Sequence, residues 1–344
     1  MKPAESYARA GVDLEVARRI PQRIAAAVRS THRPEVISDL AAFAGLYRAD
    51  ALKAMKEPVL VASTDGVGTK VKVAARLGRW ETIGYDLVHH CVNDILVHGA
   101  RPLFFLDYIA AARIDLEVVA QIVESVAAAC RAVGCALLGG ETAEMPGIYV
   151  PGELDLVGTI VGVVERHRIR DGRGIRPGDR LLALPSNGLH TNGYSLARKV
   201  LENLNWERYM PELDTSIGEA LLAPHRCYLE PVQALEEAGI EIKGLAHITG
   251  GGVMENLPRI LPPGTAAILH RGTWPEPPIF SLIQRLGAVD PEEMFRVFNM
   301  GLGMILVVSP EMAERALALR PSELFAVGEI TAGEPTVHVQ GIHG

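Results

Sequence analysis

Apolar residues in the first half of the chain follow two periods, one typical of strands and one typical of helices. Short apolar runs predict strands at residues 58–62, 102–111, 135–138 and 156–164. Apolar side chains three or four positions apart predict helices at residues 83–95 and 115–134. Asp115 is a suitable N-cap for the second helix, and Gly134 is a suitable end. This alternation indicates an α/β domain.

The second half of the chain repeats this alternation, so two α/β domains are predicted. Its predicted strands lie at residues 180–184, 245–248, 266–270, 304–308, 326–330 and 336–339. Its predicted helices lie at residues 194–204, 219–222, 228–238, 253–261, 280–286 and 311–319. Arg, Asp, Gly and Pro dominate residues 166–179, which marks a domain boundary. The prediction is an N-terminal domain at 58–167 and a C-terminal domain at 175–344.

Residues 1–57 are predicted to form an irregular arm that carries one helix. Asp13 is a suitable cap for this helix, and Pro21 should kink or restart it. Four apolar residues are spaced to share one face of it: Val16, Ile20, Ile24 and Val28.

Composition places the chain among ordinary globular proteins that act on small molecules. It has 344 residues, of which 48% are hydrophobic and 22% charged, enough for two domains with substantial cores. The net charge of −7, without a basic run, gives no general attraction to nucleic acid. No apolar stretch is long enough to cross a bilayer, and we expect a cytoplasmic protein. The four Cys form no C-x-x-C pair, so buried free thiols are expected.

The segment Ser63 to Lys70 combines a carboxylate, two glycines, hydroxyl groups and an ammonium directly after a predicted strand. Such a set can hold a metal-bound polyphosphate at a strand end. The spacing matches neither the P-loop nor the dinucleotide-binding fingerprint, so a phosphate would be held by another fold. The alternative is a hairpin turn at Asp65-Gly66. Residues 70–73 alternate in polarity, which predicts an exposed strand after the motif.

Two other glycine-rich segments offer sites for charged groups. Thr249-Gly250-Gly251-Gly252 precedes a predicted helix, where free backbone N–H groups favour a phosphate, although a tight turn would also account for it. Gly139-Gly140-Glu141 follows a predicted strand and presents a carboxylate at its end. Asp65, Asp94 and Glu141 could together hold Mg²⁺, which prefers a few carboxylates plus phosphate oxygens. Taken alone, Asp94 is equally consistent with a solvated helix residue.

The eleven His residues include no H-E-x-x-H or H-x-H pair, so the sequence does not support transition-metal catalysis. His190 and His247 each adjoin a glycine-containing loop, and for His190 a functional role and simple loop hydrogen bonding are equally consistent. No G-x-S-x-G or other nucleophile motif is present.

Five motifs occur in a fixed order: Ser63–Lys70 (STDGVGTK), Cys91–Asp94 (CVND) with Gly99–Leu106 (GARPLFFL), Gly139–Gly147 (GGETAEMPG), His190–Arg198 (HTNGYSLAR) and His247–Pro262 (HITGGGVMENLPRILP). Together they closely resemble the phosphoribosylformylglycinamidine cyclo-ligase family, the aminoimidazole ribonucleotide synthetases of purine biosynthesis. The resemblance runs from about Tyr7 to the last predicted strand. One departure is the segment Ser38–Gly45, where relatives carry a glycine-rich run.

The resemblance implies a mixed α/β (α+β) fold, with an N-terminal sheet that forms a barrel across a homodimer, a C-terminal mixed sheet with helices, and an active site between the domains. It implies ATP-dependent ring closure of formylglycinamidine ribonucleotide, with ADP and phosphate released and no nucleic-acid or membrane partner. It assigns Mg-ATP to Asp65, Asp94 and Glu141, ATP phosphate to Lys70, and a substrate or nucleotide phosphate to Gly250–Gly252 near His190. The catalytic residues implied are Asp65, Lys70 and His190. The other residues implied to bind ATP or the substrate phosphate are Thr64, Gly66, Gly68, Thr69, Asn93, Gly139, Gly140, Asn192 and Thr249.

Two other interpretations remain consistent with the chain. The first is a small-molecule kinase or transferase of the same superfamily, such as thiamine monophosphate kinase or selenophosphate synthetase. The chain has Thr249-Gly250-Gly251 where the kinases tend to carry an Asp, and it has no Cys before Cys91 for the selenium enzyme. The second is a nucleotide-binding assembly or maturation factor, which would bind ATP without substrate-dependent ADP release.

Overall fold

A computed structural model describes residues 14–40 and 42–342, so the predicted cap Asp13 lies outside the described residues. The chain divides into two compact units, one holding residues up to 95 with 100–168, the other holding 96–99 with 169–344. The elements of the N-terminal unit are α2 (Leu14–Arg29), η1 (Asp50–Ala54), β1 (Pro58–Gly66), η2 (Gly68–Lys70), α3 (Val71–Leu77), α4 (Ile83–Leu96), β2 (Arg101–Ala111), α5 (Leu116–Ala132), β3 (Ala136–Glu144), β4 (Leu154–Glu165) and η3 (Arg166–Arg168). None of the described helices is long and apolar enough to cross a membrane.

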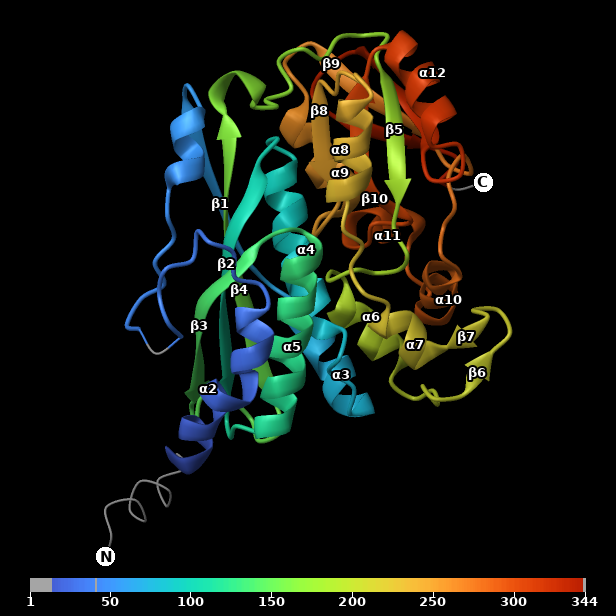
Figure 1. Ribbon diagram of the computed structural model, residues 1–344. Coiled ribbons are helices and arrows are strands. Elements are labelled where there is room, and N and C mark those ends of the chain that lie inside the picture. Colours follow the sequence, from blue (N-terminus) through green and yellow to red (C-terminus); the bar gives the residue numbers. More distant parts are fainter. Residues whose placement is uncertain (1–13, 41, 343–344) are drawn as a thin grey trace, which may run out of the picture. The chain divides into compact units, whose positions relative to one another are not determined.

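The N-terminal unit is built on a four-stranded sheet in the order β1-β4-β2-β3, which forms half of a barrel. β4 pairs antiparallel with both of its neighbours, and β2 pairs parallel with β3. Helices α4 and α5 cover one face of this sheet (Figure 1). Alternate residues of β1 therefore point toward the helices or away from them. On the outer face Leu60 keeps 61% of its side chain exposed.

Helices α2, α4 and α5 of this unit form where the apolar spacing predicts them. The Asp115 side chain accepts hydrogen bonds from the backbone N–H groups of Glu117 and Val118, which confirms it as the cap of α5. The chain leaves this helix through Gly134, whose φ of +67° suits a residue without a side chain. α2 packs on α5, and Arg23 of α2 pairs with Glu117 and with Glu124 of α5 at 3.2 and 2.5 Å.

The C-terminal unit contains a six-stranded mixed sheet in the order β12-β9-β11-β5-β10-β8. Strands β5 and β8 both pair antiparallel with β10, which lies between them. They therefore run in the same direction, and the loops that follow them leave the sheet at the same end of the strands. Its elements are β5 (Arg180–Pro185), α6 (Tyr194–Leu201), β6 (Tyr209–Met210), β7 (Thr215–Ser216), α7 (Ile217–Leu222), α8 (Leu229–Glu237), β8 (Gly244–His247), α9 (Gly252–Asn256), η4 (Leu257–Ile260), β9 (Thr265–His270), α10 (Pro278–Gly287), α11 (Pro291–Val297), β10 (Leu302–Val308), α12 (Pro310–Leu319), β11 (Phe325–Ala332) and β12 (Val337–Gln340).

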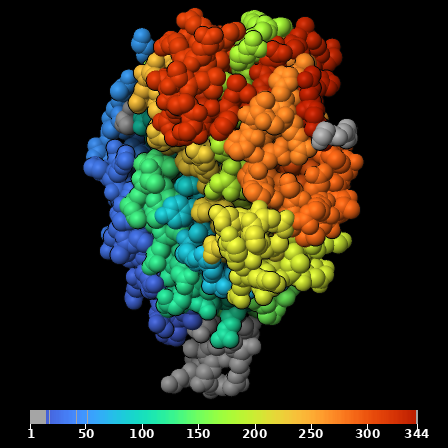
Figure 2. Space-filling view, turned by 90° about the vertical axis from the view of Figure 1, so that its right-hand side faces the viewer, coloured from blue at the N-terminus to red at the C-terminus, as the bar shows by residue number. Residues whose placement is uncertain are grey.

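A small hairpin, β6–β7, lies on the surface of the C-terminal unit. Figure 2 shows this yellow segment beside the orange chain that includes α10. The Arg285 side chain of α10 donates to Glu212 in the hairpin at 2.6 Å. Both side chains are largely exposed, so this pair adds less than about 1 kcal/mol to stability.

Three elements differ from the predictions. Residues 70–73 were expected as a strand but enter helix α3, because Gly68 turns the chain at a φ of +56° and Val71 and Ala74, three positions apart, are buried together. Residues 139–144 were expected as a loop but continue strand β3, because they pair with β2. Helix α11, capped by Asp290, was not predicted. In each case pairing or packing with a distant segment outweighs a short local pattern.

Candidate active site

Two carboxylates of the N-terminal unit meet at one histidine. Asp65 ends β1 and Asp94 lies on α4, while His90 stands one helical turn before Asp94. The Nε2 atom of His90 lies 3.2 Å from Asp65 Oδ2 and 3.6 Å from Asp94 Oδ2. Ser63 also donates to Asp94 Oδ2 at 3.1 Å. The strand-end aspartate and the helix aspartate, 29 positions apart in the sequence, thus face one point.

The two carboxylates change the pKa of His90. Burial acts to lower the pKa of His90, but its hydrogen bond to Asp65 and the charges of Asp94, Asp65 and Asp86 outweigh that effect and raise the pKa above its ordinary value. The site therefore favours a positive charge between the two carboxylates. A divalent cation with oxygen ligands would meet the same electrostatic demand.

The role of Lys70 at the ATP phosphate stays a prediction, and in this structure its ammonium meets a carboxylate of its own unit. Its side chain is fully buried, and its Nζ donates to Asp86 Oδ1 at 2.7 Å, where Asp86 is also fully buried. Burial lowers the pKa of Lys70, and the nearby charge of Asp86 offsets this only in part. The ammonium is held inside the unit because Val71, the next residue, packs into the core at the start of α3. In this structure the Lys70 side chain is thus one half of a buried ion pair.

The remaining predicted residues of the N-terminal unit fall in different places. Thr64 points to the outer face of the sheet and its hydroxyl lies 2.8 Å from that of Thr159, away from Asp65. Asn93 is fully buried on α4, between His90 and Asp94 in sequence. Gly66, Gly68 and Thr69 form the turn from β1 into α3, and the Gly66 N–H donates to the Asp65 side chain at 3.2 Å.

Glu141 is not brought to the two aspartates within one chain. It lies on β3 at the opposite edge of the sheet from β1. The register aligns Asp65 with Gly158, Asp107 and Gly140 across the strands. Three strand spacings of about 4.8 Å place Asp65 roughly 14 Å from this end of β3. A carboxylate set that includes Glu141 would need a second copy of the chain, so this part of the metal prediction stays a prediction.

The segment that departs from the family pattern lies over the outer face of the same sheet. The Tyr47 ring packs on Phe104 with 5.3 Å between centroids, and Gly45 leaves no room for a side chain beside Leu138. A cavity of about 880 Å³ separates this segment from the strands, and its lining includes Gly139, Gly140 and Glu141. The two glycines therefore border open space, although they lie within a strand.

In the C-terminal unit, the loops after β5 and β8 bring together the predicted residues. Asn192 lies so close to Gly250 that a Cβ on this glycine would stand 3.4 Å from the Asn192 Nδ2 atom. His190 belongs to the first loop, and its Nε2 lies 3.1 Å from Asn187 Oδ1. His190 has a φ of +62°, which is uncommon for a residue other than glycine and is found most often at functional positions.

The glycine loop itself is held by Asn256 of α9. The Asn256 amide donates to the carbonyl groups of Gly250 and Gly252 at 3.0 and 2.8 Å, and Thr249 donates to its oxygen at 3.3 Å. Gly251 and Gly252 have φ values of +90° and +57°, which side chains disfavour. A Cβ on Gly252 would also come within 2.0 Å of the Phe295 carbonyl oxygen. The glycines are therefore required by the turn, whether or not the loop binds phosphate.

Two residues that the sequence analysis missed complete this region. Asn299, before β10, accepts from Ser186 at 2.7 Å and donates to the Gly188 carbonyl at 2.9 Å, so it fixes the loop that carries His190. His225 lies between α7 and α8 and stacks on His190 with 4.1 Å between ring centroids. No local motif marks either residue, because each acts through a partner more than 30 positions away.

The chain is similar to known proteins over nearly its whole length. Residues 46–164 match the family model of the AIR synthase related protein N-terminal domain, and residues 176–340 match that of its C-terminal domain. Phosphoribosylformylglycinamidine cyclo-ligase of Myxococcus xanthus is 52% identical over 335 residues, covering 96% of both chains. The enzyme of the same name from Syntrophotalea carbinolica is 50% identical over 343 residues, covering 96% of this chain and 97% of its own.

Solved structures share the fold at much lower identity. Thiamine-monophosphate kinase from Stenotrophomonas maltophilia aligns with a TM-score of 0.65 and 18% identity, over 93% of this chain and 95% of its own. The hydrogenase maturation protein HypE in complex with ATP aligns with a TM-score of 0.65 and 20% identity, over 94% and 91% of the two chains. These two proteins represent the alternative functions considered for the sequence, and at this identity they share the architecture alone. By its domain models and its full-length relatives, the chain belongs to the AIR synthase related family, among the phosphoribosylformylglycinamidine cyclo-ligases.

Proposed function

We propose that this protein closes the imidazole ring of aminoimidazole ribonucleotide, using ATP and formylglycinamidine ribonucleotide and releasing ADP and phosphate. The observation that carries the proposal is the 52% identity to a cyclo-ligase over 96% of both chains. The same five motifs that suggested the family lie within the aligned region. We place the reaction in the cytoplasm, as a step of purine biosynthesis.

The chemistry of this reaction suits a site without a covalent nucleophile. An amide oxygen is a poor leaving group, so ATP phosphorylates it, and the neighbouring amine attacks the activated carbon as phosphate departs. Such a phosphoryl transfer depends on positioning and on neutralising charge. The reaction therefore requires carboxylates for a metal, donors for phosphate, and a group that moves protons.

We assign the metal-bound triphosphate to Asp65 and Asp94. Their oxygens converge on His90 Nε2 at 3.2 and 3.6 Å, and the raised pKa of His90 supports a local preference for positive charge. Oxygen ligands of this kind fit Mg²⁺, which in such a site would neutralise the phosphate oxygens. Ser63 donates a hydrogen bond of 3.1 Å to Asp94 and so orients this carboxylate.

We assign the substrate phosphate to the loop Thr249–Gly252 and its neighbour Asn192. The 3.4 Å approach between Asn192 Nδ2 and the Cβ position of Gly250 would place an amide donor beside this loop. His190 lies on the same loop as Asn192, and we propose it as the group that exchanges a proton with the substrate.

A homodimer is part of this proposal. The outer face of the N-terminal sheet exposes Leu60 at 61% and Leu106 at 36%, and both are large apolar residues on a half-barrel. A second half-barrel would cover these residues and could bring Glu141 of one copy to the aspartates of the other. Sedimentation equilibrium of the protein and of a Leu60→Glu variant tests this: we expect twice the chain mass for the first and a single chain mass for the second.

The catalytic proposal is tested with purified protein, ATP and Mg²⁺. We expect ADP to appear only when formylglycinamidine ribonucleotide is added, with aminoimidazole ribonucleotide formed in equal amount. Thiamine monophosphate serves as the rival substrate. Equal ADP release with thiamine monophosphate, or ATP binding without any substrate-dependent release, would refute the proposal.

A further inference from the structure

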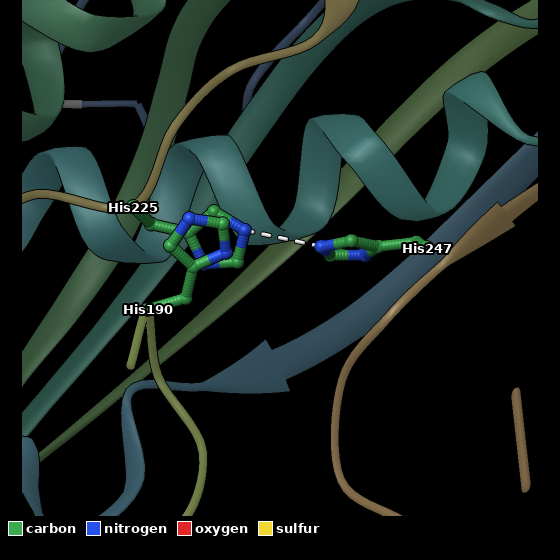
Figure 3. Close-up of side chains that lie close together, drawn as sticks. All are labelled: His190, His225 and His247. Carbon is green, nitrogen blue, oxygen red and sulfur yellow. Dashed lines mark hydrogen bonds between the residues drawn. The ribbon is translucent and has the colours of Figure 1, made fainter. Parts of the chain in front are cut away.

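Three histidines from separate segments of the C-terminal unit gather at one place. His190 lies in the loop after β5, His225 between α7 and α8, and His247 at the end of β8. Their side chains are 1%, 1% and 6% exposed. Figure 3 shows the ring of His247 facing those of His190 and His225, which overlap in the view. One nitrogen from each residue lies within 4.8 Å of the other two.

We propose that His190, His225 and His247 form a binding site for one transition-metal dication of the zinc type. Imidazole nitrogen is the ligand that Zn²⁺, Co²⁺, Ni²⁺ and Cu²⁺ prefer, whereas Mg²⁺ prefers oxygen. Three histidines leave a fourth tetrahedral position open for water or a ligand. This site is separate in composition from the carboxylate pair assigned to Mg²⁺, and it goes beyond the proposed ring closure.

The distance between two of the ligand atoms already fits a metal. His225 Nε2 and His247 Nε2 are 3.0 Å apart and directed at each other. Two imidazoles on a tetrahedral zinc, with bonds of about 2.0–2.1 Å, hold their nitrogens about 3.3 Å apart. If either ring moved outward by a few tenths of an ångström, an ion could bind both nitrogens in place of their hydrogen bond.

The other ring nitrogens have the oxygen partners that metal-binding histidines use. His225 Nδ1 lies 3.3 Å from the hydroxyl oxygen of Thr191. His190 Nε2 donates a hydrogen bond to Asn187 Oδ1 at 3.1 Å, which makes Nδ1 the atom that His190 would offer to a metal. Such partners fix the tautomer and the ring orientation of a ligand.

One ring must turn for the third bond to form. His190 stacks on His225 with 24° between the planes, so the lone pairs of the two rings lie in nearly parallel planes and cannot meet at one point between them. Rotation of His190 away from this stack would aim its nitrogen at the ion. Because His190 is also the residue we place at the substrate, an occupied site would withdraw it from the reaction, and the metal would act as an inhibitor.

The test measures metal binding directly on the full-length protein, with any purification tag removed and metals stripped by a chelator. Zn²⁺ affinity is determined in competition with a chromophoric chelator, and Co²⁺ is added to a second sample to record its visible spectrum. We expect one ion per chain, a tetrahedral Co²⁺ spectrum, and no displacement by millimolar Mg²⁺. Binding should weaken as the pH falls, because protons compete with the ion for the imidazole nitrogens.

Variants identify the ligands. We expect His225→Gln and His247→Gln each to weaken Zn²⁺ at least 100-fold, and Thr191→Val to weaken it about 10-fold by loosening His225. Two other histidines of the same unit, His270 and His338, are the matched controls, and their Gln variants should bind as the parent does.

Three results would overturn the proposal: no Zn²⁺ uptake by the parent protein, unchanged uptake in both His225→Gln and His247→Gln, or equal loss in the His338→Gln control. Far-UV circular dichroism checks that each variant is folded. If a ligand variant unfolds, the Zn²⁺-induced rise in melting temperature of the parent and of Thr191→Val decides instead, because an ion that binds only the folded state must raise it. Absence of any rise in the parent refutes the site.

Discussion

The buried pair Lys70–Asp86 allows a sharp test of whether Lys70 stabilises the fold or binds the ATP phosphate. Both side chains are 0% exposed, and their charged atoms are 2.7 Å apart. Lys70→Met keeps the apolar stem but removes the ammonium, which leaves the Asp86 carboxylate buried without its cation. Loss of one partner from a buried pair costs about 3–5 kcal/mol of unfolding free energy. For a unit of this size, at about 2–4 °C per kcal/mol, the melting temperature should fall by roughly 6–20 °C.

The matched control is a surface pair in the same unit. Lys72 and Glu153 are 2.6 Å apart, but each side chain is 38% exposed. Lys72→Met should therefore cost less than about 1 kcal/mol. The double variant Lys70→Met/Asp86→Leu removes both buried charges and should recover most of the loss, because an apolar pair needs no desolvation of charge.

The assay combines urea unfolding and calorimetry with ATP affinity measured by titration on the folded variants. A double-mutant cycle gives the coupling between Lys70 and Asp86. If Lys70→Met melts within about 2 °C of the parent, like the Lys72 control, but loses ATP binding, then the reasoning is wrong and Lys70 reaches the phosphate in a conformation other than this one.

Three further predictions follow from the structure. Asp94→Asn should weaken Mg-ATP while leaving the fold intact, and an unchanged Mg²⁺ dependence of the rate would remove Asp94 from the metal site. Burial raises the pKa of Asp107 to about 7, so the stability that its protonated form contributes below a pH of about 4 is lost as the pH rises to about 7. The melting temperature of the parent should therefore fall relative to that of Asp107→Asn between pH 5 and 7 and then stay level. A difference between the two melting temperatures that does not change with pH would contradict this. Gly252→Ala should destabilise more than Gly251→Ala: a Cβ at Gly252 would meet the Phe295 carbonyl oxygen of the backbone at 2.0 Å, whereas a Cβ at Gly251 would meet the Glu255 side chain, at 2.4 Å from Oε2. The positive φ of Gly251 adds about 1 kcal/mol to its cost, and equal melting temperatures of the two variants would show that the loop relaxes.

The elements themselves followed from the sequence wherever the apolar period ran for several turns or a full strand. Helices α4 and α5 and strands β1, β2 and β4 lie where local spacing predicts them, because burial of one face dictates that spacing. The motifs likewise identified the family, since five ordered segments define it together. Short patterns failed: residues 70–73 alternate for too few positions to separate a strand from a helix turn.

The tertiary structure decided which side chains lie together, because no local sequence pattern specifies the order of the strands in a sheet. The order β1-β4-β2-β3 places Glu141 at the edge opposite Asp65, although both residues adjoin glycines near a strand end. The parallel course of β5 and β8 around β10 brings His190 to His247, and the segment after α7 adds His225 to them. The sequence determined that a carboxylate, a lysine and a histidine were available. The packing of distant segments determined that the Asp65 carboxylate faces His90, that Lys70 is buried, and that His190 lies beside two other histidines.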